Sequence, residues 1–442
     1  MMKTIIFVSI ISCTLAGRLG WSQEVLDLSL EEALTMAIKN SPEIQVQNIN
    51  QQISQKADEK VDARRLPKIS AAGDFRLNTQ LQSTVLPFDI TGQNPEGTST
   101  VRFGTRFQNT LNLQLEQPIY HPENKIQRAI NANRMADENE HLKEIEQSVK
   151  KKITESYYST IYSREKIDIA EKELKAAEFI LSTGNTQYQK GTIRENELLK
   201  LKVTVANAQL TLERAQNDYS TNLTELKKQL YLDRQMVINP SDSISELENR
   251  IQDRALQTSS VQASLRRMEL DESYAELRSE LIMAERRVSL DAYAQYGLLQ
   301  LNDQFNPVDF NSWYPYNYLG IQIGVPIFDG KLSKLKAQDE LLERKKSQLQ
   351  LVQLKRDLKE EEIQARKELA FSQRALELAR ENLELAETIY SNDQLRFEKG
   401  TLLPADLRQS ELEITRSRDS YLDAIYAFLV ADLELRDVLG DF

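Results

Sequence analysis

Two stretches of this 442-residue chain nearly repeat each other: LNLQLEQPIY at Leu111–Tyr120 and LGIQIGVPIF at Leu319–Phe328, 208 positions later. A second pair, YQKGT at Tyr188–Thr192 and FEKGT at Phe397–Thr401, follows in the same order at an offset of 209. Two matches at nearly one offset indicate an internal duplication, and a repeat decides the architecture of a chain. We therefore divide the sequence into a first repeat over 23–240 and a second over 241–442.

Glycine and proline are segregated within each repeat. Between Pro122 and Pro240 the sequence contains no other proline and only Gly184 and Gly191. Between Gly330 and Pro404 the only such residue is Gly400. Spans without helix breakers predict uninterrupted helices of roughly 65 residues, about 100 Å long. Apolar residues three and four apart, as in the segment 167–181, predict coiled-coil hairpins over about 123–231 and 331–439, although the core of an ordinary helical bundle would explain each seam taken alone.

Four other segments alternate apolar and polar residues with a period of two, which is typical of strands. They cover about 69–82 and 101–118 in the first repeat and about 287–301 and 316–328 in the second. Pro118 and Pro326 are expected to end the second strand of each repeat, because proline cannot donate within a central ladder. The apolar faces are expected to include the following residues: Phe103, Phe107, Leu111, Leu113, Leu115, Ile321, Ile323 and Val325.

An apolar strand face needs a cover. In a soluble sandwich a second sheet covers it, and in an outer-membrane barrel it faces lipid while the polar face lines water. Four strands do not close a barrel, so the membrane alternative requires several chains to share one sheet: two chains would give eight strands and three would give twelve. The connecting segment 302–314 and its surroundings carry Trp313, Tyr314, Tyr316 and Tyr318, which suit either a membrane interface or a surface loop.

Composition excludes several classes of protein. The mean hydropathy is −0.51, and no run beyond the N-terminus approaches 18 apolar residues, which excludes a helical membrane protein. A net charge of −11 argues against a nucleic-acid partner. Gly330-Lys331 lacks the flanking residues of a phosphate-binding loop, and no nucleophile elbow is present, so we expect neither an enzyme nor a cofactor.

The N-terminus is typical of an exported protein. Lys3 followed by the apolar run Ile5–Ile11 predicts a signal peptide over 1–22. Cys13, the only cysteine, also stands in a context that resembles a lipobox, where it would carry a lipid. One cysteine and two distant histidines provide no disulfide framework and no metal site, and we interpret His121 and His141 as solvated structural residues.

Taken together, these features resemble the TolC-type outer-membrane efflux proteins. The resemblance rests on the duplicated pattern, the start SLEEALTMAIKNSPEI at Ser29–Ile44, the strand ends QPIY and VPIF, and the two KGT motifs, and it covers the chain from about Glu24 onward. It implies a mainly α fold with a β-barrel: a homotrimer with a twelve-stranded barrel in the outer membrane, continued by a periplasmic α-helical barrel. It further implies a passive exit duct of a tripartite efflux or type I secretion system, working with a periplasmic adaptor protein and an inner-membrane transporter.

The resemblance also assigns roles to the helix tips. It implies that the tips dock the adaptor and form the closable end of the tunnel; the matching residues are Lys190, Gly191, Thr192, Ile193, Lys399, Gly400, Thr401 and Leu402. Glu197 and Asp406 match positions where relatives place lumenal acids, although both would also suit a helix N-terminal turn. In some relatives a second acid and a gating arginine lock neighbouring subunits together at the tips. Gln409 and Leu402 stand at those positions here, so the resemblance does not extend to this lock.

A different class of protein also fits the helical part. A periplasmic adaptor or structural protein built of coiled-coil hairpins would show the same seams. Its sheets would be soluble domains, and it would not need two matching strand pairs at the repeat offset. The strand segments therefore favour the channel.

Overall fold

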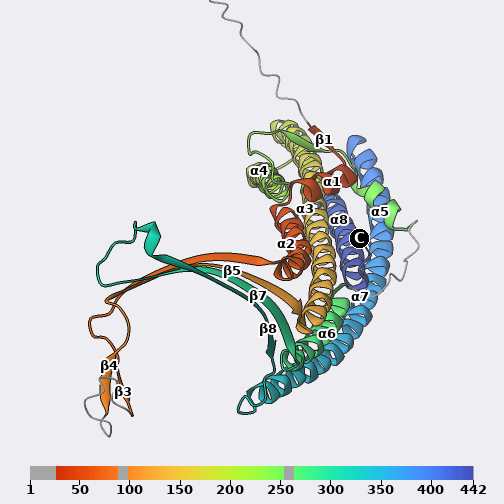
Figure 1. Ribbon diagram of the computed structural model, residues 1–442. Helices are drawn as coiled ribbons and strands as arrows, with labels where there is room; N and C mark the ends of the chain where they lie inside the picture. The colour runs from red at the N-terminus through yellow and green to blue at the C-terminus, as the bar shows by residue number, and fades with distance from the viewer. Residues whose placement is uncertain (1–25, 88–97, 253–262, 442) are drawn as a thin grey trace, which may run out of the picture.

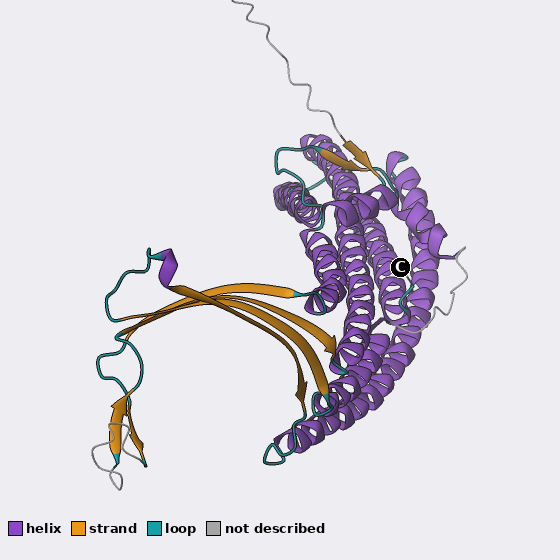
Figure 2. Ribbon diagram, viewed as in Figure 1, coloured by secondary structure: helices purple, strands orange, loops and turns teal. Residues whose placement is uncertain are grey.

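The computed structural model describes residues 26–87, 98–252 and 263–441. The expected signal peptide and Cys13 lie outside the described residues. Figure 1 shows a curved layer of helices from which long strands extend to one side. The chain therefore has an α-helical part and a β part, which meet where the strands join the long helices (Figure 2).

Two helical hairpins form most of the helical layer. The first consists of α3 (Glu123–Gln189) and α4 (Glu195–Gln229), and the second of α7 (Leu332–Glu398) and α8 (Pro404–Leu439). Both α3 and α7 have 67 residues, and the second hairpin begins 209 positions after the first. At 1.5 Å per residue each long helix spans about 100 Å. Within the described residues, no helix combines the length and apolarity needed to cross a bilayer.

Shorter helices complete the layer along the half of each long helix that lies near the strands. Helix α2 (Pro42–Arg64) packs on α3, and α6 (Ala263–Ala284) packs on both α3 and α7. The amide of Gln47 donates to the backbone oxygen of Glu138 at 3.0 Å, which fixes α2 against the first half of α3. Helix α4 covers the second half of α3. Each long helix is thus flanked along its whole length.

A small second layer joins the two repeats near the middle of α3. Strand β1 (Leu26–Leu28) pairs in parallel with β6 (Ile238–Pro240), and each strand leads into a short helix, α1 (Leu30–Asn40) or α5 (Ile244–Gln252). Buried Asp242 accepts hydrogen bonds from the Tyr157 hydroxyl and the Leu30 N–H, both at 2.7 Å. A buried carboxylate needs such partners, and here they come from α3 and from the start of the first repeat. The main hydrophobic core surrounds this junction.

The β part is one four-stranded antiparallel sheet in the order β2-β5-β7-β8. Its strands are β2 (Lys68–Leu77), β5 (Phe107–Tyr120), β7 (Ser289–Asn302) and β8 (Trp313–Gly324). Both repeats contribute two strands, and β5 pairs with β7 across the repeat boundary. A small hairpin of β3 (Ser83–Leu86) and β4 (Ser99–Arg102) extends from the loop between β2 and β5, and a 3-10 turn, η1 (Phe310–Ser312), precedes β8.

Three expectations about the strands are wrong. The single strand expected over 101–118 is broken into β4 and β5, because Gly104 adopts a left-handed conformation with φ of 117°. Phe103 consequently lies between strands. Pro118 does not end β5: the strand continues to Tyr120 with a register shift against β7. Pairing with β2 has already ended at Glu116, so at Pro118 only one neighbouring strand is left and the missing N–H is tolerated.

The end of the second repeat's sheet also differs from expectation. Strand β8 covers Trp313–Gly324 instead of about 316–328. Val325 therefore lies beyond the strand, and Pro326 stands two residues past its end. The chain leaves the sheet earlier here than in the first repeat, and Gly330 and Lys331 both adopt positive φ values of 67° and 71° where it turns into α7.

Candidate functional site

The two helix tips have the same backbone geometry. The Thr192 N–H donates to the Gln187 oxygen at 2.9 Å and the Gly191 N–H to the Tyr188 oxygen at 2.9 Å. The second tip repeats both bonds at 2.9 Å, from Thr401 and Gly400. These are the paired bonds of a Schellman motif, which satisfies the last carbonyls of a helix. The threonine hydroxyls donate to the same carbonyls, at 2.8 Å in the first tip and 2.9 Å in the second.

Glycine is required at the tips by conformation and not by lack of space. Gly191 and Gly400 both have a φ of 74°, in the left-handed region. A Cβ added at either position would meet no atom within 4 Å. An L-residue there costs about 1 kcal/mol or more in backbone energy. The glycines are thus explained as helix stops, with no need for a partner.

The other tip residues divide between exposed and inward positions. Lys190, Thr192, Lys399 and Thr401 are exposed. Leu402 is partly buried against a small cluster in which Ile180, Leu201, Phe397 and Leu407 join all four helices of the two hairpins. The rings of Phe179 and Phe397 lie 6.2 Å apart across the same junction. The two tips are therefore held side by side, with their lysines and threonines facing solvent.

The two candidate gate acids differ in their surroundings. Both are exposed, and both are the third residue of their helix. The Arg194 N–H donates to the Glu197 carboxylate at 3.4 Å, so Glu197 supports the start of α4. Among the described residues, none makes a side-chain hydrogen bond or ion pair with the Asp406 carboxylate. The carboxylate of Asp406 is therefore the more available of the two.

A buried acid that the sequence analysis missed lies on α8 of the second hairpin, five residues after Asp406. Glu411 of α8 is 3% exposed, and its carboxylate accepts a hydrogen bond from the Thr415 hydroxyl at 3.2 Å. Burial is the main cause that raises the pKa of Glu411 to about 7, and the negative charge of Glu173 on α3 contributes in the same direction. The signal was present in the sequence: between Leu407 and Ile414, where the seam needs an apolar residue, Ser410 and Glu411 stand instead.

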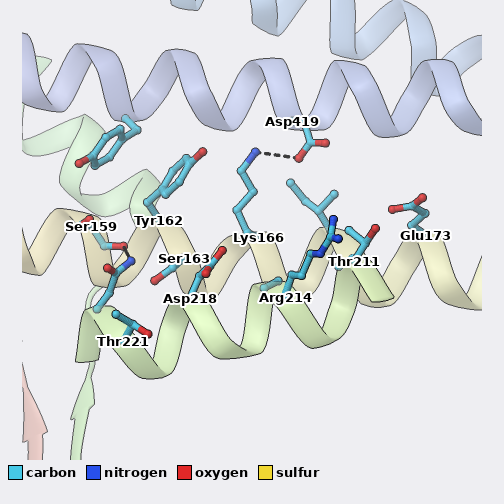
Figure 3. A pocket seen from close by; sticks show the side chains of 15 residues that line it. Ser159, Tyr162, Ser163, Lys166, Glu173, Thr211, Arg214, Asp218, Thr221 and Asp419 are labelled. Atoms are coloured by element: carbon cyan, nitrogen blue, oxygen red, sulfur yellow. Dashed lines mark hydrogen bonds and ion pairs between the residues drawn. The ribbon is translucent and has the colours of Figure 1, made fainter. Parts of the chain in front are cut away.

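A polar hollow of about 480 Å³ lies between α3, α4 and α8 (Figure 3). Lys166 crosses it and contacts Asp419 and Asp423, each at 2.9 Å. Lys166 follows Tyr157 by about two and a half helical turns, so it faces away from the second layer that Tyr157 contacts. The face of the helical layer opposite β1 and β6 is therefore lined by charged side chains.

The sheet has one apolar and one polar face. Leu113 lies between Ala71 of β2 and Tyr296 of β7, and the residues that share its face include Ile69, Phe75, Leu77, Phe107, Leu111, Leu115, Leu298, Leu319, Ile321 and Ile323. Most of these large side chains are exposed, with Leu319 at 87% and Ile321 at 65%. Phe103 and Val325, expected on this face, lie outside the strands, as described above. An exposed apolar face of this size requires a cover.

The aromatic residues of β8 divide between the two faces. Trp313 lies on the apolar face, and Tyr316 and Tyr318 lie on the polar one. The Tyr316 hydroxyl donates to the Asn112 side chain at 2.7 Å, and its ring covers Gly297, where an added Cβ would stand 2.3 Å from a ring carbon. The two tyrosines are therefore packed on the polar face and do not act as a membrane-interface belt.

Contrary to the expectation of a solvated residue, the side chain of His121 is only 24% exposed. It follows β5 directly, and its ring nitrogens lie 2.8 Å from a Glu123 carboxylate oxygen and 2.9 Å from an Asp291 carboxylate oxygen. The hydrogen bond to Asp291 is the main cause that raises the pKa of His121. The imidazole thus ties the start of α3 to β7.

Comparison with solved structures identifies the class of this fold. The chain matches CusC, a protein that forms a transmembrane channel, over 97% of its length and 96% of CusC, with a TM-score of 0.73 and 13% identity. It matches VceC of Vibrio cholerae (TM-score 0.67, 13% identity, 93% and 96% covered) and CmeC of Campylobacter jejuni (TM-score 0.70, 12% identity, 100% and 94% covered). The fold is that of outer-membrane channel proteins.

The sequence itself points to one family. The model of the outer membrane efflux protein family matches residues 33–230, which cover most of the first repeat. None of the curated proteins matches the sequence. The resemblance to TolC-type outer-membrane efflux proteins that the sequence analysis proposed is confirmed.

Proposed function

We propose that this protein is the outer-membrane exit channel of a tripartite efflux or type I secretion system. Three copies would each contribute four strands to a closed twelve-stranded barrel. Their helical layers would together form the wall of a periplasmic tunnel. The channel would be passive, with energy supplied by an inner-membrane transporter. The family match and the shared fold of outer-membrane channels support this assignment.

The observation that carries the proposal is the open sheet. Its outer strands β2 and β8 each pair on one side only within the described chain. Unpaired strand edges are a liability in water, and in lipid every backbone group needs a partner, so closure with other copies would resolve both demands. The exposed apolar face would meet hydrocarbon, and the polar face with Asn112 and Gln295 would line water.

The helical layer supports assembly in the same sense. Helix α7, at one edge of the layer, exposes a series of large apolar side chains that includes Leu342, Leu349 and Phe371. At the opposite edge, α2 exposes Ile49 and Ile53, and α4 exposes Leu199, Val203 and Leu210. Two different apolar edges fit a head-to-tail ring of identical copies. In such a ring the charged hollow around Lys166 would face the tunnel.

The tips are proposed as the contact with the adaptor and as the entrance of the tunnel. Their lysines and threonines are exposed, and the sequence pattern matches the family's tips. Threefold symmetry would bring three copies of Asp406 together near the constriction. A periplasmic adaptor role for this chain itself, the alternative considered from sequence, has no specific observation in its favour.

A charge-scanning experiment tests the membrane assignment. Leu113→Arg places a charge on the proposed lipid face, and Gln114→Arg, one residue away on the opposite face and exposed, is the matched control. An arginine at mid-bilayer depth costs about 2–4 kcal/mol on the lipid face of a barrel, and much less in the lumen. We expect Leu113→Arg to remove the protein from the outer-membrane fraction and to abolish conductance in planar bilayers, while Gln114→Arg keeps both. Equal behaviour of the two variants, or a wild-type monomer that dissolves without detergent, would refute the proposal.

A further inference from the structure

A second hollow, of about 240 Å³, lies where the sheet joins the helices. It is lined by the last residues of β5, the first turns of α3 and the end of α2. Three cationic side chains reach it: Arg65 from the C-terminal cap of α2, and Lys125 and Arg128 from α3. His121 lines it as well. Three elements therefore converge to place positive charge in one small cavity.

Half of these cationic side chains have no local carboxylate partner. Arg128 pairs with Asp62, and His121 lies between Glu123 and Asp291. For Arg65 and Lys125, by contrast, the described part of the chain provides no carboxylate within ion-pair distance. Because both nitrogens of His121 face carboxylate oxygens, both must carry a proton for both bonds to form. The hollow thus holds two unpaired cations beside two paired ones.

The residues around the hollow are apolar and exposed. Ile119 and Tyr120 line it and are 53% and 54% exposed, and nearby Leu66 and Ile69 are 61% and 70% exposed. In water, the unpaired cations would lack a partner and the exposed apolar side chains would lack a cover. A ligand with an anionic head and apolar tails would satisfy the cations and the apolar side chains together.

The second repeat carries the same kind of residues at the same place. Arg64-Arg65 stands two residues before the start of β2, and Arg286-Arg287 stands one residue before the start of β7. Phe328, the counterpart of Tyr120 in the duplicated pattern, is 80% exposed. Paired arginines therefore mark the helix-side end of the first strand in both repeats, where the proposed barrel would leave the bilayer.

We infer that the hollow at Arg65 and Lys125 binds the phosphate of an anionic phospholipid from the periplasmic leaflet of the outer membrane. The inference rests on the proposed function, since only a barrel in the membrane would bring lipid to this place. Lys125 and Arg65 would donate charge-assisted hydrogen bonds to the phosphate oxygens, and Arg128 would add its remaining donors. The acyl chains would lie along Ile119, Tyr120 and Ile69.

Native mass spectrometry of the intact, detergent-solubilised protein tests this inference. Phosphatidylglycerol is titrated against the wild type, the variant Arg65→Gln/Lys125→Gln, and the control Lys200→Gln/Lys202→Gln, whose lysines are exposed on α4. Each basic residue near an anionic lipid surface contributes a factor of about five in affinity, so we expect the first variant to bind about thirtyfold more weakly. The control should bind like the wild type. Phosphatidylcholine and glycerol phosphate are titrated in parallel.

The outcomes separate this inference from the proposed function. If the first variant conducts in planar bilayers and binds phosphatidylglycerol as tightly as the control, the lipid site is refuted and the channel stands. Equal binding of phosphatidylcholine would refute the preference for an anionic lipid. Glycerol phosphate that binds as tightly as the lipid would show a soluble phosphate site instead. A wild type that neither conducts nor enters the outer membrane would refute the proposed function itself.

Discussion

Replacing the buried acid Glu411 with glutamine should stabilise the protein at alkaline pH and leave it nearly unchanged in acid. Glu411 is 3% exposed, and the pKa of its carboxyl is raised from 4.5 to about 7 by burial, with Glu173 opposing ionisation from α3. The folded state therefore holds the proton more tightly than the unfolded chain. Stability falls as pH rises from about 4.5 through 7, because the unfolded chain releases this proton first.

The size of the effect follows from the displaced pKa. A shift from 4.5 to about 7 corresponds to about 3 kcal/mol once the pH exceeds 7. The value of about 7 already includes the opposing effect of Arg408 and Arg418, so nothing further is subtracted. Glutamine is the uncharged counterpart of the protonated acid, and its side-chain oxygen still accepts the Thr415 hydroxyl. Glu411→Gln should therefore be about 3 kcal/mol more stable than the wild type near pH 8, and less than about 1 kcal/mol more stable near pH 5.

Thermal unfolding followed by circular dichroism at the two pH values measures this difference. Glu413→Gln is the matched control, because Glu413 lies two residues away on the same helix and is exposed. It should change stability little at either pH. If Glu411→Gln gains nothing at alkaline pH, or gains equally at both, the buried carboxyl does not titrate as described.

Three further predictions concern the tips and the sheet. Gly400→Ala should destabilise the second tip by about 1 kcal/mol, since its φ of 74° is unfavourable for alanine. Gly400→Asn should lose about half as much stability. Equal melting temperatures for the two variants would contradict this prediction. Gly297→Ala should disrupt the sheet, because the new Cβ would stand 2.3 Å from the Tyr316 ring; adding Tyr316→Ser should restore folding, and a double variant no better than the single one would exclude this contact as the cause. If three Asp406 side chains form the gate, hexammine cobalt should block conductance of the wild type and fail to block Asp406→Ala. Glu197→Ala is the control and should keep the block, since Glu197 already accepts the N–H of Arg194. Unchanged blocking of Asp406→Ala would defeat the assignment.

Local features were readable from the sequence wherever one residue type has one conformational role. Prolines and glycines delimit the long helices because proline lacks a donor and glycine permits a left-handed stop. The Schellman geometry at Gly191 and Gly400 is a property of a short segment and hardly depends on the rest of the chain. The strand bounds were less predictable. Gly104 interrupts one strand, and Pro118 sits inside another because a neighbouring strand ends two residues earlier.

The duplication, the helical hairpins and the alternating strands were determined by the sequence alone, because periodicity and helix breakers act along the chain. Only the tertiary structure decided what these elements bring together. It placed β5 against β7 across the repeats, seated Tyr316 over Gly297, buried Glu411 against Glu173 and gathered Arg65 with Lys125 at the end of the sheet. The seam between Leu407 and Ile414 marks the place of Glu411 on a packed helix face, but its neighbours come from residues far apart in sequence, and no local pattern encodes them.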